Sequence, residues 1–177
     1  MGYAIVGYFD NKSDVIVREL WKGMAEIGVD DYLYKSENNP HFKFIIYEQL
    51  DLDRVKTILE SLAKNQEKIP IQFKSYSFYP NDMPFINIDI AVSTEILNLH
   101  QKIRKKVDLY SKTYGVDYFD NGIWKPDCQL TKEIPKEKLE TAIKYLADRA
   151  LPFSGQINRL GIIEFHPAKQ IVSYELV

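Results

Sequence analysis

The hydrophobic residues of this chain follow two periods, one typical of strands and one typical of helices. At the start of the segment 41–48, Phe42 and Phe44 alternate with more polar residues, which predicts a strand with one buried face. After Asp51, apolar residues recur every three or four positions, which predicts a helix. By the same criteria, the expected strands are 3–9, 41–48, 70–79, 84–92, 124–131, 153–165 and 170–176, and the expected helices are 11–27, 51–65, 94–114 and 136–150.

Turn-forming and capping residues separate these elements. Pro80-Asn81-Asp82 and His166-Pro167-Ala168-Lys169 are typical of turns, so the strands on either side of each are expected to form antiparallel hairpins. Residues 29–40 are polar and mixed, and we expect a loop there. The expected helix caps are Asn11, Ser13 or Asp14 for the first helix, Asp51 for the second and Ser93 or Thr94 for the third, with Gly28 ending the first.

The order of elements repeats itself once along the chain. The unit of strand, helix, proline, strand and strand occurs twice, and a strand that follows a proline, Pro40 or Pro126, opens each copy. A doubled unit of this kind predicts an α+β fold in two pseudo-symmetric lobes, with antiparallel sheets facing a cleft and helices outside. Since no low-complexity linker separates the lobes, we expect residues 1–177 to form a single bilobal domain.

The two repeated strands carry polar residues on one face. On the first, Phe42 lies on the apolar face, so His41 and Lys43 point to the opposite surface. On the second, Cys128 takes the core face, and the polar set is Asp127, Gln129 and Thr131. If a pseudo-twofold axis relates the lobes, these two polar faces look at each other across the cleft.

Composition and charge narrow the class of protein. The chain has 177 residues, of which 45% are hydrophobic, and a formal net charge of −2, so we expect an ordinary packed core and no wholesale electrostatic capture of long nucleic acid. The single cysteine, Cys128, excludes an internal disulfide and fits a reducing cytosol. No apolar stretch approaches the roughly 20 residues that cross a bilayer. We therefore expect a cytoplasmic protein without membrane contact.

Several segments carry a resemblance to a known family when they are taken together. They are the Pro-His-hydrophobic-x-hydrophobic strand at 40–44, the Leu97-x-x-His100 helix to Val107, the Trp124-Lys125-Pro126 lead into 127–131, and the terminal strand Val172-Ser173-Tyr174-Glu175-Leu176. In order and spacing they resemble the two-histidine (2H) phosphoesterases, which include 2′-5′ RNA ligase-like proteins and cyclic nucleotide phosphodiesterases. The resemblance covers nearly the whole chain and implies the RNA and nucleotide phosphodiester class of function.

The family pattern also implies roles for the polar residues. It contains two copies of His-hydrophobic-(Thr/Ser)-hydrophobic, whose histidines act as general base and general acid and whose hydroxyls hold phosphate oxygens. Here only His41 matches, because Asp127 stands at the second histidine and Lys43 and Gln129 stand at the hydroxyl positions. The resemblance implies His41 and Asp127 as the catalytic pair, and Lys43, Gln129 and Thr131 as the phosphate-binding residues.

The aspartate at the second position predicts that catalysis is altered or lost. A carboxyl group with the ordinary pKa of ~3.9 is ionised at pH 7, so it cannot donate a proton and it repels phosphate. Three functions stay open. Asp127 as base with a protonated His41 as acid gives a phosphodiesterase, a hydrolase of 2′,3′-cyclic phosphates or 2′-5′ linkages. A nucleotide or an RNA end binds without cleavage in the second, with Lys43 supplying charge. In the third, Lys43 and Asp127 pair and close the cleft of an interaction protein.

Other candidate residues indicate structure rather than chemistry. His100 lies on the apolar stripe of its helix, and His166 lies in a turn, so the three histidines fall in separate elements without metal-ligand spacing. We therefore expect no metal site, and no motif indicates a cofactor. The basic run from Lys102 to Lys106 is typical of a solvated helix face, with RNA contact as the alternative. Arg159 is a further candidate for the cleft.

Overall fold

A computed structural model of the chain describes residues 2–165 and 168–177. Its strands are β1 (Gly2–Phe9), β2 (His41–Leu50), β3 (Ile69–Tyr79), β4 (Phe85–Ile90), β5 (Ser111–Thr113), β6 (Asp127–Gln129), β7 (Phe153–Phe165) and β8 (Lys169–Glu175). Its α-helices are α1 (Asn11–Glu26), α2 (Tyr32–Lys35), α3 (Leu52–Ala63), α4 (Thr94–Val107) and α5 (Leu139–Ala147), and single 3-10 turns lie at Asp108–Tyr110, Asp117–Phe119 and Lys136–Lys138. The predicted α+β class is confirmed.

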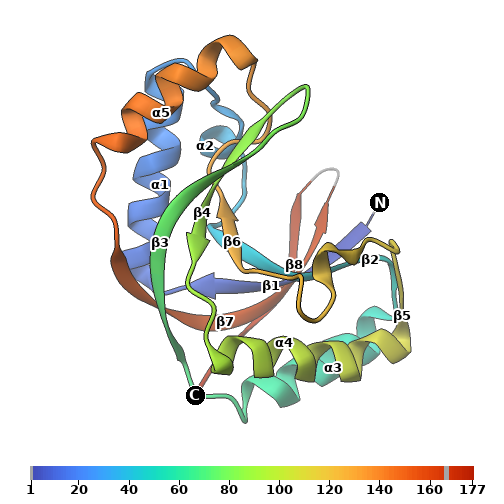
Figure 1. The fold of residues 1–177 in the computed structure, drawn as a ribbon. Helices are drawn as coiled ribbons and strands as arrows, with labels where there is room; N and C mark the ends of the chain where they lie inside the picture. The colour runs from blue at the N-terminus through green and yellow to red at the C-terminus, as the bar shows by residue number, and fades with distance from the viewer. Residues whose placement is uncertain (1, 166–167) are drawn as a thin grey trace.

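The described strands join one antiparallel sheet rather than two separate ones. Its order is β1-β2-β6-β4-β3-β7-β8, with β5 on β2, and β1 also pairs with β7, so the path closes on itself. The long strand β7 permits this closure because residues 153–157 pair with β3 while residues 157–165 pair with β1. The strands of the two predicted halves are therefore continuous through β6 and β7 (Figure 1).

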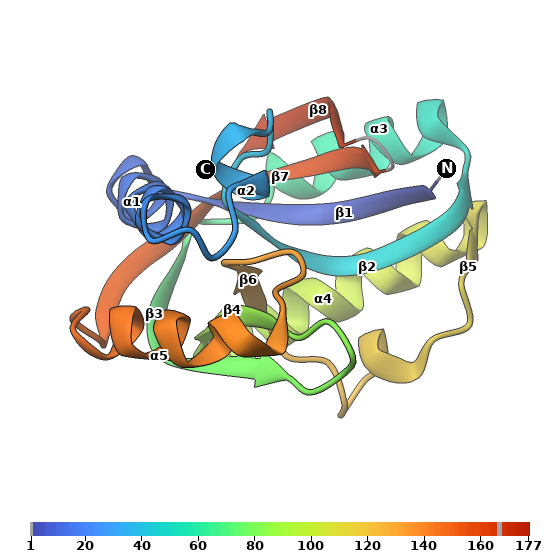
Figure 2. The same cartoon turned by 90° about the horizontal axis from the view of Figure 1, so that it is seen from above.

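The longer helices lie outside the sheet in two pairs. Figures 1 and 2 show α1 beside α5 at one end of the molecule and α3 beside α4 at the other. Each helix turns an apolar stripe inward, as Val17 and Leu20 do on α1 and Val55 and Leu59 do on α3, all of them buried. Burial of these stripes against the sheet is the main source of stability for helices of this length.

Capping residues define where these helices begin and end. Asp51 accepts a hydrogen bond from the Arg54 backbone N–H at the start of α3, as predicted, and Ser93 does the same for α4. The first helix is different, because Asp10, and not one of the three residues expected, caps α1. Gly28 follows the end of α1 with φ of 71°, a conformation that favours glycine, which confirms it as the terminator.

Element boundaries differ from prediction where tertiary pairing competes with local pattern. The expected helix 94–114 ends at Val107, because residues 111–113 pair with β2 as β5. The other differences are a short helix, α2, inside the expected loop 29–40; a strand at 127–129 in place of 124–131; and a 3-10 turn plus α5 in place of one helix over 136–150. In the turn expected at 166–169, His166 and Pro167 lie outside the described residues.

Candidate functional site

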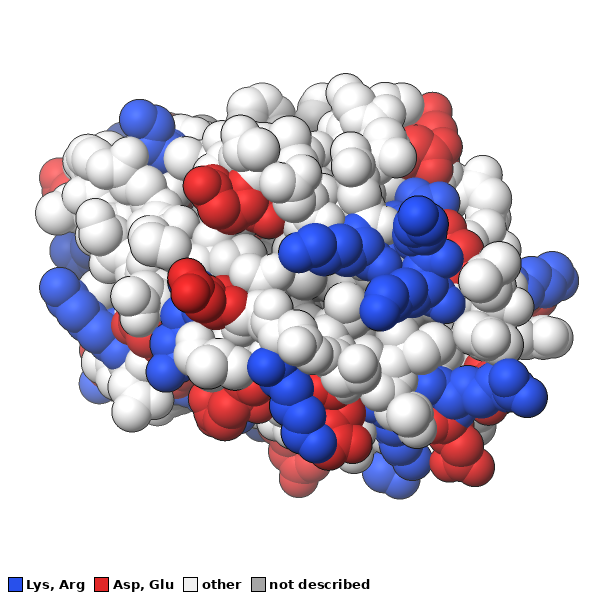
Figure 3. Space-filling view, turned by 90° about the horizontal axis from the view of Figure 1, so that it is seen from below, with Lys and Arg blue, Asp and Glu red and all other residues white. Residues whose placement is uncertain are grey.

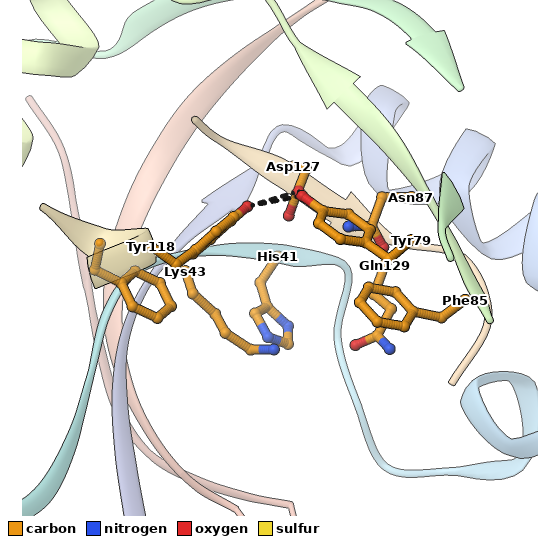
Figure 4. Close-up of a pocket in the computed structure, with 9 residues that line it drawn as sticks. His41, Lys43, Tyr79, Phe85, Asn87, Tyr118, Asp127 and Gln129 are labelled. Carbon is orange, nitrogen blue, oxygen red and sulfur yellow. Dashed lines mark hydrogen bonds between the residues drawn. The ribbon is translucent and has the colours of Figure 1, made fainter. Parts of the chain in front are cut away.

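A cavity of about 430 Å³ lies where β2, β6 and β4 meet. Four of the five site residues expected from the sequence, His41, Lys43, Asp127 and Gln129, line it together (Figure 4). The other lining residues are Tyr79, Phe85, Asn87, Tyr118 and Phe119. A volume of this size falls in the range of small-molecule sites.

Strand alternation places the four residues. Phe42 of β2 pairs with Cys128 of β6, and both side chains are buried in the core, with 0% and 1% of their surface exposed. Their sequence neighbours therefore point to the opposite face, where the cavity lies. Because the strands are antiparallel, Lys43 lies on the side of Asp127 and His41 on the side of Gln129.

The imidazole of His41 is held in one orientation. Its Nδ1 lies 2.7 Å from the backbone oxygen of Asn39, and since a carbonyl oxygen only accepts, Nδ1–H is the donor. This bond leaves Nε2 with its lone pair free. Burial, and then the charge of Lys43, lower the pKa of His41 to about 4. The ring is therefore neutral at pH 7 and suited to accept a proton rather than to give one.

Lys43 provides the cation of the cavity. Burial lowers its pKa, and the nearby charge of Asp127 opposes this shift. Figure 4 shows the side chain extending away from Asp127. Within the described residues, the Lys43 ammonium makes no ion pair at 4.0 Å or less and no hydrogen bond. The Lys43–Asp127 pair that one of the three predicted functions requires is therefore not formed.

Asp127 is bound by two phenols instead. Its Oδ2 accepts hydrogen bonds from Tyr118 Oη at 2.8 Å and from Tyr79 Oη at 3.0 Å, and the two hydroxyls lie 3.2 Å apart (Figure 4). Burial and the Asp127 charge raise the pKa of Tyr118, and burial is the largest cause of the raised pKa of Tyr79. Neither phenol is thus a ready proton donor to a leaving group. Asp127 Oδ1 makes no hydrogen bond with any described residue.

The far wall of the cavity combines an aromatic pair with an amide. Phe85 stacks on Tyr79 at 4.7 Å between ring centroids and 10° between planes. Asn87 is 4% exposed, and its Oδ1 has no hydrogen-bond partner in the described part of the chain. The sequence contains a signal for Asn87, because it interrupts the apolar run of Ile86 and Ile88, but sequence reasoning missed it. No local pattern singles out Tyr118, which lies in a 3-10 turn.

Both tryptophans of the chain fasten the backbone of the site. Trp124 Nε1 donates to the backbone oxygen of Lys43, and Trp21 Nε1 donates to that of Gln129, each at 2.9 Å. Both indoles are buried, with 4% and 3% exposed. Each strand that carries a site residue is therefore held by the same kind of bond at its second polar position.

The structure does not bring Thr131 into the cavity, so its expected place beside phosphate is wrong. The strand β6 ends at Gln129, so the alternation of faces does not continue to residue 131. Thr131 is fully buried, and its Oγ1 accepts a hydrogen bond from the Ile86 backbone N–H at 2.8 Å. Its hydroxyl therefore fastens β4 to the end of β6.

Other residues named from the sequence lie outside this cavity. His100 is buried with 1% exposed and stacks on Trp124 at 4.1 Å. Arg159 lies over the Tyr8 ring, 5.0 Å from its centroid. In the basic run, Arg104 binds Asp108 and Asp120, whereas its lysines are exposed. Figure 3, a view from the side of α3 and α4, shows basic side chains gathered on one part of that face.

Two further properties were searched for among the described residues. They contain no group of three or more His, Cys, Asp and Glu side chains arranged to hold a metal ion. None of their helices combines the length and the apolar character needed to span a membrane.

Comparison with known proteins places the fold. No family model matches the chain, and no curated protein matches it in sequence. Solved structures do match: TT0787 of Thermus thermophilus (TM-score 0.65, 12% identity, 99% of this chain and 98% of that one) and E. coli LigT complexed with 3′-AMP (0.62, 10%, 99% and 97%). Kluyveromyces marxianus Usb1 matches with a TM-score of 0.55 and 10% identity, over 99% and 97%.

The fold is therefore that of the two-histidine phosphoesterases, as the sequence resemblance implies. The matches extend over nearly the full length of each chain, so they compare whole molecules and not one shared motif. At 12% identity or less they concern the fold alone.

Proposed function

We propose that the cavity binds a nucleotide or the phosphorylated end of an RNA, and that it does so without the two-histidine reaction. The observation that carries this proposal is the Lys43 ammonium, which lines a 430 Å³ cavity without an ion-pair partner in the described chain. A buried cation without a counter-ion is a favourable partner for a phosphate oxygen, since a charged hydrogen bond is among the strongest in proteins. LigT, which shares the fold, has been solved with 3′-AMP, ATP, NADP+ and phosphate.

The protonation states argue against turnover by the two-histidine route. That route needs a base on one side of the phosphate and a proton donor on the other. His41, with a pKa of about 4, has the form of a base at pH 7. The group facing it from β6 is a carboxyl that accepts two phenolic hydrogen bonds, and the raised pKa values of those phenols oppose proton donation. The pair of His41 as acid and Asp127 as base would need an imidazolium, which a pKa of about 4 disfavours at neutral pH.

The binding proposal predicts that removal of the Lys43 charge abolishes most of the affinity. Isothermal titration calorimetry with 3′-AMP, ATP and inorganic phosphate should detect binding to the unmodified chain. Lys43→Met should weaken it at least tenfold, because a charged hydrogen bond is worth about 1.5–3 kcal/mol and ~1.4 kcal/mol is tenfold. Lys105→Met is the matched control, since Lys105 is exposed on α4. No binding at millimolar ligand, or equal loss in both variants, contradicts the proposal.

A phosphodiesterase remains the second candidate, favoured by one observation. The bond from His41 Nδ1–H to Asn39 leaves Nε2 free, which is the state that a general base requires. On this alternative, 2′,3′-cyclic nucleotides are hydrolysed and His41→Ala removes the activity. Turnover of a cyclic nucleotide panel, with the products separated by chromatography, decides between them. Turnover that His41→Ala eliminates would replace the binding proposal with this one.

A further inference from the structure

The cavity carries one cation and one anion that do not neutralise each other. Lys43 and Asp127 both line it, yet their charged atoms are more than 4.0 Å apart, and the phenols of Tyr79 and Tyr118 hold the carboxylate where it is. Such a layout complements a ligand that presents an anionic group and a hydrogen-bond donor side by side. It disfavours a ligand that presents only anionic oxygens, because the carboxylate repels them.

The geometry at Asp127 shows which atom would meet the donor. Both phenolic hydrogen bonds end on Oδ2. Oδ1 is therefore left with its full acceptor capacity on the cavity side of β6. An ionised carboxyl can only accept, so the ligand group it meets must carry an O–H or N–H.

We infer that Asp127 Oδ1 accepts the free 2′-hydroxyl of a ribose whose 3′-phosphate is bound at Lys43. This inference rests on the proposed nucleotide function and specifies its ligand class as nucleoside 3′-monophosphates, or RNA ends with a 3′-phosphate. The two groups fit because the 2′-hydroxyl and the 3′-phosphate are on adjacent ribose carbons. A 2′,3′-cyclic phosphate fits poorly, since its 2′-oxygen has no hydrogen and its negative charge faces the carboxylate.

The replacement of a histidine by an aspartate then acquires a physical meaning. An aspartate at this position turns the group opposite His41 from a proton donor toward phosphate into an acceptor toward a hydroxyl. Asp127 is thus a specificity-determining residue for ribose, and the two tyrosines are positioning residues that hold its carboxylate.

Calorimetric titration of one ligand pair tests the inference on the unmodified chain. Adenosine 3′-monophosphate should bind at least tenfold more tightly than 2′-deoxyadenosine 3′-monophosphate, which differs only by the hydroxyl, and more tightly than 2′,3′-cyclic AMP. Asp127→Ala should bring the ratio of the first two to about one. Glu133→Ala, which removes an exposed carboxylate shortly after β6, should keep it.

The outcomes separate this inference from the function on which it rests. Equal affinity of the ribose and deoxyribose ligands for the unmodified chain overturns the inference and leaves nucleotide binding intact. A ratio that survives in Asp127→Ala, with native circular dichroism and cooperative melting, also overturns it. If Asp127→Ala does not fold, Tyr118→Phe, which removes one bond to Oδ2 and should lower the ratio, replaces it. Failure of every nucleotide to bind overturns the proposed function itself.

Discussion

His41 and Lys43 lie two residues apart on one face of β2, and their proximity divides the work between them. The charge of Lys43 adds to burial in lowering the pKa of His41 to about 4, so at pH 7 one residue is a cation and the other a neutral acceptor. The sequence predicts which side chains share the cavity, because strand alternation depends on residues next to each other. It does not predict their protonation states, since these depend on burial by segments far away in the chain.

A second histidine shows the same dependence on burial and allows a prediction for stability. Burial, and then the charge of Arg104, lower the pKa of His100 to about 4 from its ordinary value of 6.5. The folded state therefore favours the neutral ring more than the unfolded state does. This contribution is present above pH 6.5 and is lost as the pH falls through 4. It amounts to about 3 kcal/mol at most, from ~1.36 kcal/mol per pKa unit.

His100→Phe tests this directly, because a phenyl ring keeps the stack on Trp124 but cannot titrate. Urea unfolding at intervals from pH 7.5 to pH 4 should show a smaller loss of stability for the variant than for the unmodified chain. His41 titrates in both proteins, so its share of the pH dependence cancels in the comparison. Parallel curves over the whole range would show that His100 is not the group responsible.

At the scale of elements, β2 and β6 are held by bonds from outside the sheet. Trp21 reaches from α1 to Gln129, and Trp124 reaches from the loop before β6 to Lys43. The strand β6 has only three residues and pairs with β2 at a single position, Phe42 with Cys128. A short strand has few ladder bonds of its own, so these indole N–H groups replace part of what a longer strand would supply.

The two bonds predict different effects of Trp124→Phe and Trp21→Phe. Each variant should lose about 1–3 kcal/mol of unfolding free energy, since it removes one hydrogen bond and leaves a buried carbonyl unpaired. Only Trp124→Phe should also weaken phosphate binding several-fold, because Lys43 is the residue that it positions. Denaturant unfolding measures the first effect and calorimetry the second. Equal affinities of the two variants would mean that the indole bond does not position Lys43.

The element boundaries that sequence reasoning missed have a common physical cause. The pattern over 94–114 is helical throughout, but residues 111–113 gain more from pairing with β2 than from another helical turn. The expected strand 124–131 is shortened because Trp124 is drawn into the core and Thr131 into a bond with β4. Long-range partners decide both cases, and a local window does not contain them.

At the scale of the whole molecule, the repeat seen in the sequence is retained by the backbone and lost by the side chains. Trp124 holds the carbonyl of Lys43 as Trp21 holds that of Gln129, each at 2.9 Å. The side chains at these positions nevertheless differ in charge. The frame and the chemistry of the site therefore rest on different atoms, the frame on backbone carbonyls and the chemistry on side chains.

This separation explains why the fold could be predicted further than the function. The buried alternation of β2 and the helical stripes depend on apolar residues that remain in place, and they led to the correct fold class. The cavity between the halves depends on the same frame, and four expected residues do meet there. What the cavity binds depends on which atoms are left without partners, here the ammonium of Lys43 and Oδ1 of Asp127. The phenols that leave Oδ1 unoccupied come from Tyr79 and Tyr118, which the closed sheet brings to β6 from β3 and from a loop.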